Sequence, residues 1–351
     1  MDELDQFRIT VQQMEIARDL VLARAETGCR VALILLDNAG ETMLYRIVQE
    51  EFESDAFTRA FVPERYPPKA RREIDRLFAA KVKAVTTARR LPASVGATLL
   101  VLHAYRNAAY HRDSHNPAVL PLLARVALIA VADLFARTRG GIRTSGVGGY
   151  RKPMAWLQPY GFGETSVNLD VAARSIARKL KTRVRPTLPA LVQGFASDIG
   201  SRISAVREVL TNRLAAPSEQ EINRILKWFE FVYRNPDLES KLSEDYRALN
   251  YRIASGHGKE VTRDEYVDAE AKFRDGYRSA HEEYRPACMY AGLVAIETDV
   301  AKVNAAKDYR DAVQCYAALD ARITTFEQVT FAARREIEYQ SEMESDIRRG
   351  K

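Results

Sequence analysis

Apolar residues recur at the spacing of an α-helix along most of this chain, and no stretch alternates apolar and polar residues for long. Within residues 31–52, for example, Leu36, Met43 and Ile47 fall on one helical face at about 3.6 residues per turn. A similar run predicts a helix over residues 69–90. Because strands need a two-residue period, the pattern predicts an all-α protein.

Prolines mark where two further helices begin. Pro92 lies in the first turn of a predicted helix that ends near residue 111, and Asn116 followed by Pro117 predicts a capped helix over 118–137. Asparagine accepts hydrogen bonds from the first free amides of a helix. Proline fits the first turn because its missing N–H is not needed there.

The second half of the chain is also predicted to be helical. Two of its helices begin with a capping box, in which a hydroxyl and a carboxylate satisfy the first free backbone amides. These boxes are Ser218 with Glu221 and Thr262 with Glu265. A long charged helical tail is predicted over 286–349, with one break near Asp308. No reactive constellation stands out, so this half is interpreted as a scaffold or as a surface for a partner or RNA.

Glycine and proline cluster in residues 140–165, a stretch too long for a simple connection between helices. We interpret it as a basic linker or loop that divides the chain. The prediction is an N-terminal helical bundle over 1–139, followed by a second helical domain with long helices over 166–351. A phosphate loop of the Walker type is not expected, because its Gly-Lys-Ser/Thr ending is missing.

Positive charge is unevenly spread in this chain, whose formal net charge is +6. Residues 134–163 contain no acidic residue, and residues 174–185 form a second basic run. Such patches attract phosphate backbones, although a solvated surface that keeps the protein soluble is the alternative. Trp156 and Tyr160 add rings of the kind that stack on single-stranded RNA. Three basic residues are assigned to RNA binding: Arg143, Arg151 and Lys152.

Cysteine usage and hydropathy indicate the compartment. Cys29, Cys288 and Cys315 are widely spaced, without a CxxC pair or a neighbouring histidine cluster, so neither a disulfide framework nor a metal site is expected. The N-terminus is acidic and polar, and the apolar run over 126–132 is too short to span a membrane. The expectation is a cytoplasmic protein with no membrane contact and no cofactor.

Five polar side chains converge on the helix that ends near residue 111. His103, Asn107 and His111 follow one another at intervals of four residues, and Arg106 and Tyr110 lie beside that line. The four residues before His103 are apolar. A polar stripe on an otherwise buried helix requires partners, because unpaired buried polar groups are costly.

The residue types in this stripe match what RNA cleavage without a metal ion needs. Arg106 can grip a phosphate through two hydrogen bonds, and His111 can act as a general acid or base. Asn107 can fix the orientation of an imidazole. In such a reaction a base activates the ribose 2′-OH, a cation stabilises the phosphorane, and an acid protonates the leaving 5′-oxygen.

The segment from Arg106 to His111, Arg-Asn-Ala-Ala-Tyr-His, resembles the Arg-polar-x3-His motif of the HEPN superfamily. The segment around Asp37 also resembles the family's early helix, which often carries an acidic residue facing the motif. The resemblance covers roughly residues 1–139. It implies a small helical bundle and a dimer in which two motifs form one composite site. It also implies RNA products with a cyclic phosphate and a 5′-hydroxyl.

The resemblance implies a role for each motif residue. Arg106 and His111 would be the catalytic pair, Asn107 a positioning residue and Asp37 a supporting acid. We assign Tyr110 and His103 to RNA binding, although a packed core histidine is the alternative for His103.

The expected activity is that of a toxin or phage-defence ribonuclease, acting on RNA as a homodimer. An antitoxin or another regulatory protein is a possible partner. However, the tyrosine that receives a nucleotide in one subgroup, two residues after the histidine, is Asp113 here. That form of control is therefore not expected.

Two other functions are compatible with the sequence. Spacing of Arg and His alone is expected by chance in an arginine-rich chain, so the motif's weight rests on Asn107 and on its helical placement. A non-catalytic HEPN-like module that binds RNA or a nucleotide and regulates a partner is the first alternative. A purely structural helical adaptor is the second.

Overall fold

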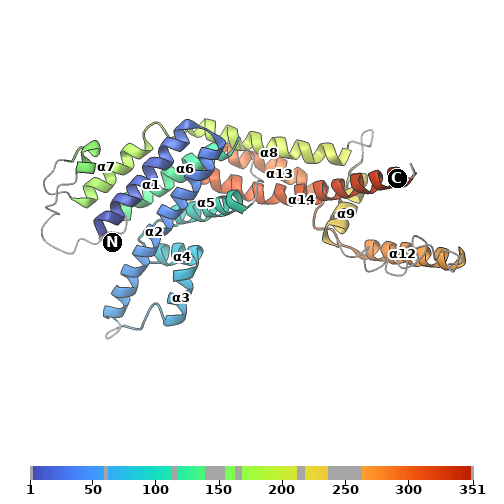
Figure 1. Ribbon diagram of the computed structural model, residues 1–351, viewed down its shortest axis with the longest axis horizontal. Helices are drawn as coiled ribbons and strands as arrows, with labels where there is room; N and C mark the ends of the chain where they lie inside the picture. Colours follow the sequence, from blue (N-terminus) through green and yellow to red (C-terminus); the bar gives the residue numbers. More distant parts are fainter. Residues whose placement is uncertain are drawn as a thin grey trace. The chain divides into compact units, whose positions relative to one another are not determined.

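The computed structural model describes residues 3–58, 62–111, 118–138, 155–162, 168–211, 218–235 and 263–348 (Figure 1). Within these ranges every regular element is a helix, so the predicted all-α fold is confirmed. The elements are α1 (Glu3–Ala23), α2 (Glu26–Thr58), α3 (Pro68–Arg76), α4 (Phe78–Thr87), α5 (Ala93–His111), α6 (Leu120–Thr138), the short 3₁₀ helix η2 (Ala155–Tyr160), α7 (Leu169–Lys181), α8 (Leu188–Thr211), α9 (Glu219–Arg234), α12 (Arg263–Glu283), α13 (Tyr290–Asn304) and α14 (Tyr309–Arg348).

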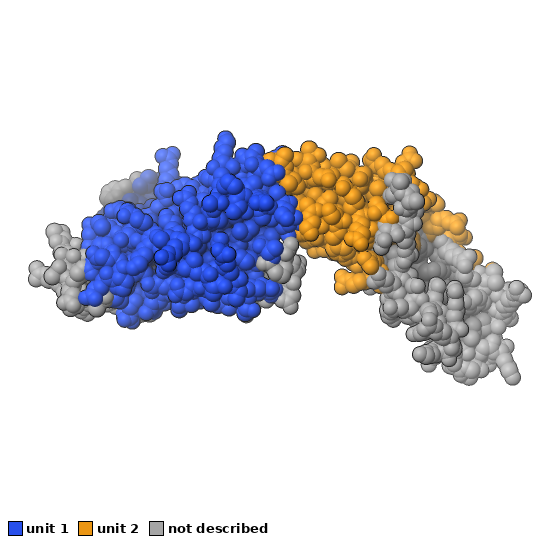
Figure 2. Space-filling model, turned by 90° about the horizontal axis from the view of Figure 1, so that it is seen from above, with its two compact units in different colours: residues 1–198, 302–317 blue, residues 199–301, 318–351 orange. Residues whose placement is uncertain are grey.

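The chain divides into two compact units (Figure 2). Unit 1 comprises residues 1–198 and 302–317, and unit 2 comprises residues 199–301 and 318–351. The sequence placed the segment that forms α7 in the C-terminal half. In the structure α7 packs against α1, α6 and η2, so unit 1 extends beyond the stretch 140–165.

The core of unit 1 is built around α6, which contacts α1, α2, α5 and α7. Residues on all sides of α6 are buried, among them Leu123, Leu128 and Phe135, as expected for a helix that is apolar all round. The ring of Phe135 lies 5.0 Å from that of Phe7 on α1. The long helix α2 packs along α1 and α6, and its partly polar side faces α4 and α5.

The helix predicted over 69–90 is two helices. Leu77 has extended backbone angles (φ −105°, ψ 125°) and ends α3, and α4 begins at Phe78. The two pieces differ in character, since α3 is highly charged and buries only Ile74, whereas α4 buries Phe78, Val82 and Val85. The break lets the apolar face of α4 pack on α2 and α5.

Two predicted helix starts are confirmed in the second half of the chain. Ser218 and Glu221 form a reciprocal capping box at the start of α9. The break near Asp308 separates α13 from α14, and the Asp308 carboxylate accepts hydrogen bonds from the amides of Arg310 and Asp311 at 2.8 and 3.0 Å. Thr262 lies outside the described residues.

Unit 2 is held together by buried or half-buried polar contacts. The buried carboxylate of Glu230 on α9 accepts a hydrogen bond from the amide of Cys288 at 2.8 Å, just before α13. Burial and this carboxylate raise the pKa of Cys288 to about 11, so its thiol stays protonated near neutral pH.

None of the described helices combines the length and the apolar composition that crossing a membrane requires.

Candidate functional site

Helix α5 carries the polar stripe. The amides of Val95 and Gly96 bond the carbonyl of Pro92, which lies just before the first helical residue. One face of α5 is buried, with Leu99, Leu102 and Tyr105 at helical spacing. Of the stripe residues that follow His103, Arg106 and Asn107 lie at the edge of this face and are half-buried.

A carboxylate from another helix meets this stripe. Asp37 lies in the middle of α2, and its side chain is only 6% exposed. Its Oδ1 lies 2.9 Å from Nδ1 of His103, and its Oδ2 lies 3.3 Å from Nε of Arg106. A buried carboxylate is costly unless it is paired, and here each oxygen faces a basic side chain of α5.

Arg106 has a second neighbour on its own helix. Its Nη1 donates a hydrogen bond to Oδ1 of Asn107 at 2.7 Å. The side chain of Arg106 is 28% exposed and that of His103 is 25% exposed, so both bases reach solvent while their carboxylate does not. Asp37, His103, Arg106 and Asn107 therefore form one connected cluster between α2 and α5.

An aromatic ring holds His103 from a third helix. Phe78, the first residue of α4, stacks on the imidazole with ring centroids 4.0 Å apart and planes 2° apart. Gly96 allows α5 to approach α4 this closely, because a Cβ there would lie 2.7 Å from a methyl group of Thr86. Phe78 could not be predicted from the sequence, because the helix break that positions it contains neither glycine nor proline.

A second charged pair extends the row of polar contacts along α2. Nζ of Lys81 on α4 lies 2.9 Å from Oε1 of Glu41, which is one turn after Asp37. The Lys81 side chain is 4% exposed and that of Glu41 is 39% exposed. The sequence did not indicate Lys81, because nothing local marks a lysine in a helix as buried.

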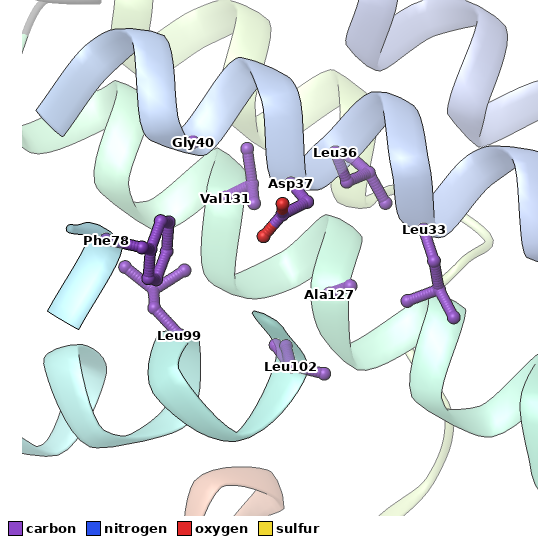
Figure 3. A pocket seen from close by; sticks show the side chains of 9 residues that line it. All are labelled: Leu33, Leu36, Asp37, Gly40, Phe78, Leu99, Leu102, Ala127 and Val131. Carbon is purple, nitrogen blue, oxygen red and sulfur yellow. The ribbon is translucent and has the colours of Figure 1, made fainter. Parts of the chain in front are cut away.

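The wall behind the Asp37 carboxylate is apolar. Figure 3 shows Asp37 among the side chains that line a small cavity of about 10 Å³, the size of one water molecule at most. The other lining residues are Leu33, Leu36, Gly40, Phe78, Leu99, Leu102, Ala127 and Val131. Since none of them can pair with a carboxylate, the partners of Asp37 come from the stripe on α5.

Several predicted site residues cannot be placed. His111 is the last residue of α5, but the described side chains include neither it nor Tyr110. Arg143, Arg151 and Lys152 lie outside the described residues. Their proposed roles therefore stay predictions.

The predicted aromatic surface near Tyr160 does not exist in the proposed form. Tyr160 is buried, and its hydroxyl donates a hydrogen bond to Glu15 of α1. Burial and this contact raise the pKa of Tyr160. Lys179 of α7 covers the ring at 5.3 Å, and Trp156 packs against Phe7 at 5.8 Å. Tyr160 therefore fastens η2 to α1 and α7, and its ring is not open to a base.

Comparison with known proteins adds no assignment. No protein-family model, no curated protein and no solved structure matches the chain. Among the described residues no three His, Cys, Asp or Glu side chains are grouped so that they could hold a metal ion. The chemistry of the site therefore depends on what Asp37, His103, Arg106 and Asn107 can do.

Proposed function

We propose that this protein is an RNA endonuclease that cuts by attack of the ribose 2′-OH, without a metal ion. The observation that carries the proposal is the shared carboxylate of Asp37, which contacts His103 and Arg106 on the motif helix. This contact brings a titratable base and a permanent cation to one spot, and both keep about a quarter of their side chain in solvent. These are the groups that transesterification of RNA requires.

Arg106 would stabilise the negative charge that develops on the phosphorane. Its guanidinium contacts Asp37 through Nε and Asn107 through Nη1, and these two contacts orient the group. His111, the histidine of the motif and the last residue of α5, would transfer a proton. Asn107 and Asp37 would position these groups.

We further propose that two copies of the chain complete one site. Part of the support is the solvent side of α5, where small or apolar residues lie next to the polar stripe. Leu100 is 37% exposed, Ala104 is exposed, and Val101 is half-buried. A second copy could pack on this strip and bring two motif helices together.

Location and biological role follow from other features. None of the three cysteines forms a disulfide, and Cys29 and Cys288 are buried thiols, which supports a reducing cytoplasm. A role as a toxin or phage-defence effector, controlled by an antitoxin or another regulatory protein, rests on the motif alone.

Cleavage of single-stranded RNA in EDTA tests the proposal. The parent should produce fragments with cyclic phosphate and 5′-hydroxyl ends, and Arg106→Ala and His111→Ala should each lower the rate by about 10²- to 10³-fold. Arg90→Ala is the matched control, because Arg90 is 47% exposed and pairs with Glu50 and Glu51 of α2, which are not part of the cluster around Asp37. If both motif variants cut as fast as the parent, the proposal is wrong.

The same assay separates the non-catalytic alternative. Arg106 already contacts Asp37 and Asn107, an arrangement that would also suit a module that only binds RNA or a nucleotide. Such a module would bind labelled RNA with a salt-dependent affinity and leave it intact. Binding without any cleavage by the parent would favour this alternative.

The dimer has its own test. Leu100→Glu places a charge on the strip of α5 without touching the contacts of Asp37. We expect sedimentation to report a monomer and cleavage to fall together with dimer formation. A variant that stays dimeric and active would show that α5 is not the dimer surface.

A further inference from the structure

His103 has contacts that a packed core histidine or an RNA-stacking ring does not need. Nδ1 lies 2.9 Å from the buried Asp37 carboxylate, and the ring face is covered by Phe78. The remaining ring nitrogen, Nε2, has no hydrogen-bond partner among the described residues, and the side chain is 25% exposed. We infer that His103 is the general base of the proposed reaction and that Asp37 is its positioning residue.

The hydrogen bond to Asp37 fixes which nitrogen carries the proton. An ionised carboxylate accepts hydrogen bonds and cannot donate one, so Nδ1 must be the donor. In the neutral ring the lone pair then lies on Nε2, for which the described residues supply no hydrogen-bond partner. When Nε2 takes a proton, the adjacent carboxylate stabilises the imidazolium that forms, as in other carboxylate–histidine pairs.

The surroundings hold the ring in this orientation. Phe78 restricts rotation from the α4 side, and the residues that α6 contributes behind the carboxylate, Ala127 and Val131, are apolar. Within the described part of the chain, the charged side chains beside the ring are therefore Asp37 from α2 and Arg106 from α5, which contacts the same carboxylate. The low exposure of Asp37 keeps water from competing for the hydrogen bond.

The inferred chemical step rests on the proposed function. Nε2 of His103 removes the proton from the ribose 2′-OH, the O2′–P bond forms, and the P–O5′ bond breaks. The leaving O5′ takes a proton from an acid, the role that remains for His111. Arg106 lies one turn after His103, about 4.5 Å along the axis, and is placed to face the same phosphate.

Helix geometry also indicates which copy of the chain supplies the acid, His111. His111 lies eight residues after His103, about 12 Å along the axis of α5. Side chains on a helix lean toward the same end, so one helix keeps such groups apart. His103 of one copy and His111 of a second copy are therefore the pair assigned to one phosphate.

Substrates with different leaving groups distinguish a base from an acid. A dinucleotide needs both, whereas uridine 3′-(4-nitrophenyl phosphate) releases a phenolate that needs no proton. We expect His103→Gln to slow both substrates by about 10²- to 10⁴-fold. His111→Ala should slow only the dinucleotide by a comparable factor. In the rate–pH profile on the aryl ester, His103→Gln should lose the limb that rises with pH.

The positioning role of Asp37 is read from the same profile. Asp37→Asn keeps the shape of the side chain and should lower the aryl-ester rate by roughly 10- to 100-fold. It should also shift the rising limb without removing it, an effect that a purely structural residue would not produce. His281→Gln, a histidine of unit 2, is the matched control and should leave rate and profile unchanged.

The outcomes separate this inference from the proposed function. If His103→Gln cuts both substrates at the parent rate while Arg106→Ala and His111→Ala do not, the inference is wrong and the ribonuclease proposal stands. If the parent cuts neither substrate, both are wrong. Should His103→Gln fail to fold, Asp37→Asn decides, and an unchanged profile overturns the inference. Ring ¹⁵N spectra of the parent should also show neutral His103 protonated at Nδ1.

Discussion

Arg106 in unit 1 and Arg202 in unit 2 both contact carboxylates, but they do so in different ways. In unit 2, Arg202 of α8 bonds Asp320, Thr324 and Glu327 of α14, with all three of its nitrogens used. In unit 1, Arg106 contacts one buried carboxylate, which it shares with His103, and one amide. We call the first cluster closed, because two carboxylates enclose one arginine, and the second open, because His103 and Arg106 share one carboxylate.

The charge of each cluster shows what the difference means. Arg202 faces two carboxylates, so its surroundings are net negative and would repel a phosphate. Burial disfavours the charged guanidinium, but the hydrogen bonds that Arg202 donates to Glu327 and Asp320 outweigh this effect and raise the pKa of Arg202. Around Arg106 one carboxylate is shared by two basic side chains, Arg106 and His103. The two clusters thus combine basic residues and carboxylates in different ratios.

The largest expected effect on stability is at the closed cluster. Arg202→Ala leaves Asp320 and Glu327 as neighbouring carboxylates with 21% exposure each, so we expect the free energy of unfolding to fall by about 3–5 kcal/mol. Urea unfolding followed by circular dichroism measures this. Arg207→Ala, which breaks an exposed pair with Glu297, is the control and should change stability by about 1 kcal/mol or less. If the two variants lowered the free energy of unfolding equally, Arg202 would contribute no more to stability than an exposed ion pair.

A third polar cluster, around Asp133 in unit 1, gives a dependence on pH. Asp133 of α6 accepts hydrogen bonds from Lys181, Tyr309 and Arg310 at 2.7, 2.7 and 3.1 Å. Burial alone would raise the pKa of Asp133, but the contact with Lys181 and then those with Tyr309 and Arg310 outweigh it and lower the pKa.

The sign of the pH effect follows from this lowered pKa. Because the folded-state pKa lies below the unfolded value of about 3.9, the contribution of Asp133 is complete above that value. It is lost as pH falls through the folded-state pKa. Asp133→Asn should therefore cost about 1–3 kcal/mol near neutral pH, and the difference from the parent should shrink in acid. Unfolding curves between about pH 6 and about pH 3 test this. A constant difference would mean that Asp133 does not act through its charge.

The open cluster should respond differently to loss of its carboxylate. Asp37→Leu puts an aliphatic side chain among the leucines that surround Asp37, while His103 and Arg106 can turn to solvent. We expect stability to be unchanged or to rise by about 1 kcal/mol, together with a loss of RNA cleavage. A fall of more than about 2 kcal/mol in the free energy of unfolding would show that the Asp37 contacts stabilise the fold, as those of Arg202 and Asp133 do.

The smallest expected effect on RNA cleavage concerns Phe78, the ring that covers His103. Phe78→Leu keeps an apolar residue at the start of α4 but removes the stacked ring, so stability should fall by about 0.5–1.5 kcal/mol. Cleavage should slow only a few-fold, because Asp37 still holds Nδ1 of His103. A loss of rate as large as that of His103→Gln would mean that the stack, and not the carboxylate, positions the imidazole.

Local patterns in the sequence located much of the architecture but only part of the site. The polar stripe on α5 follows from periodicity, and the break near Asp308 follows from an aspartate that caps the next helix. The break at Leu77 carries no such signal, since leucine neither caps nor interrupts a helix by itself. Phe78 and His103 are 25 residues apart and meet only because that break turns α4 against α5.

Asp37 illustrates the same limit for the site. The sequence suggested it as a supporting acid only through resemblance, and its spacing from the motif carries no information. The structure puts its carboxylate 2.9 Å from His103, a residue that the sequence assigned to RNA binding or to the core. For Tyr160 the sequence predicted an exposed ring that stacks on RNA, but in the structure the residue is buried and anchors η2 through Glu15.

By itself, the sequence determined that the chain is helical, where several helices begin, and that Arg106, Asn107 and His111 share one helix. These properties depend on residues a few positions apart, which helical geometry relates directly. Only the tertiary structure decided that Asp37 pairs with His103 and Arg106, that Arg202 bonds two carboxylates of α14, and that Tyr160 is buried. Those properties depend on which helices pack together, and packing depends on apolar faces summed over the whole chain.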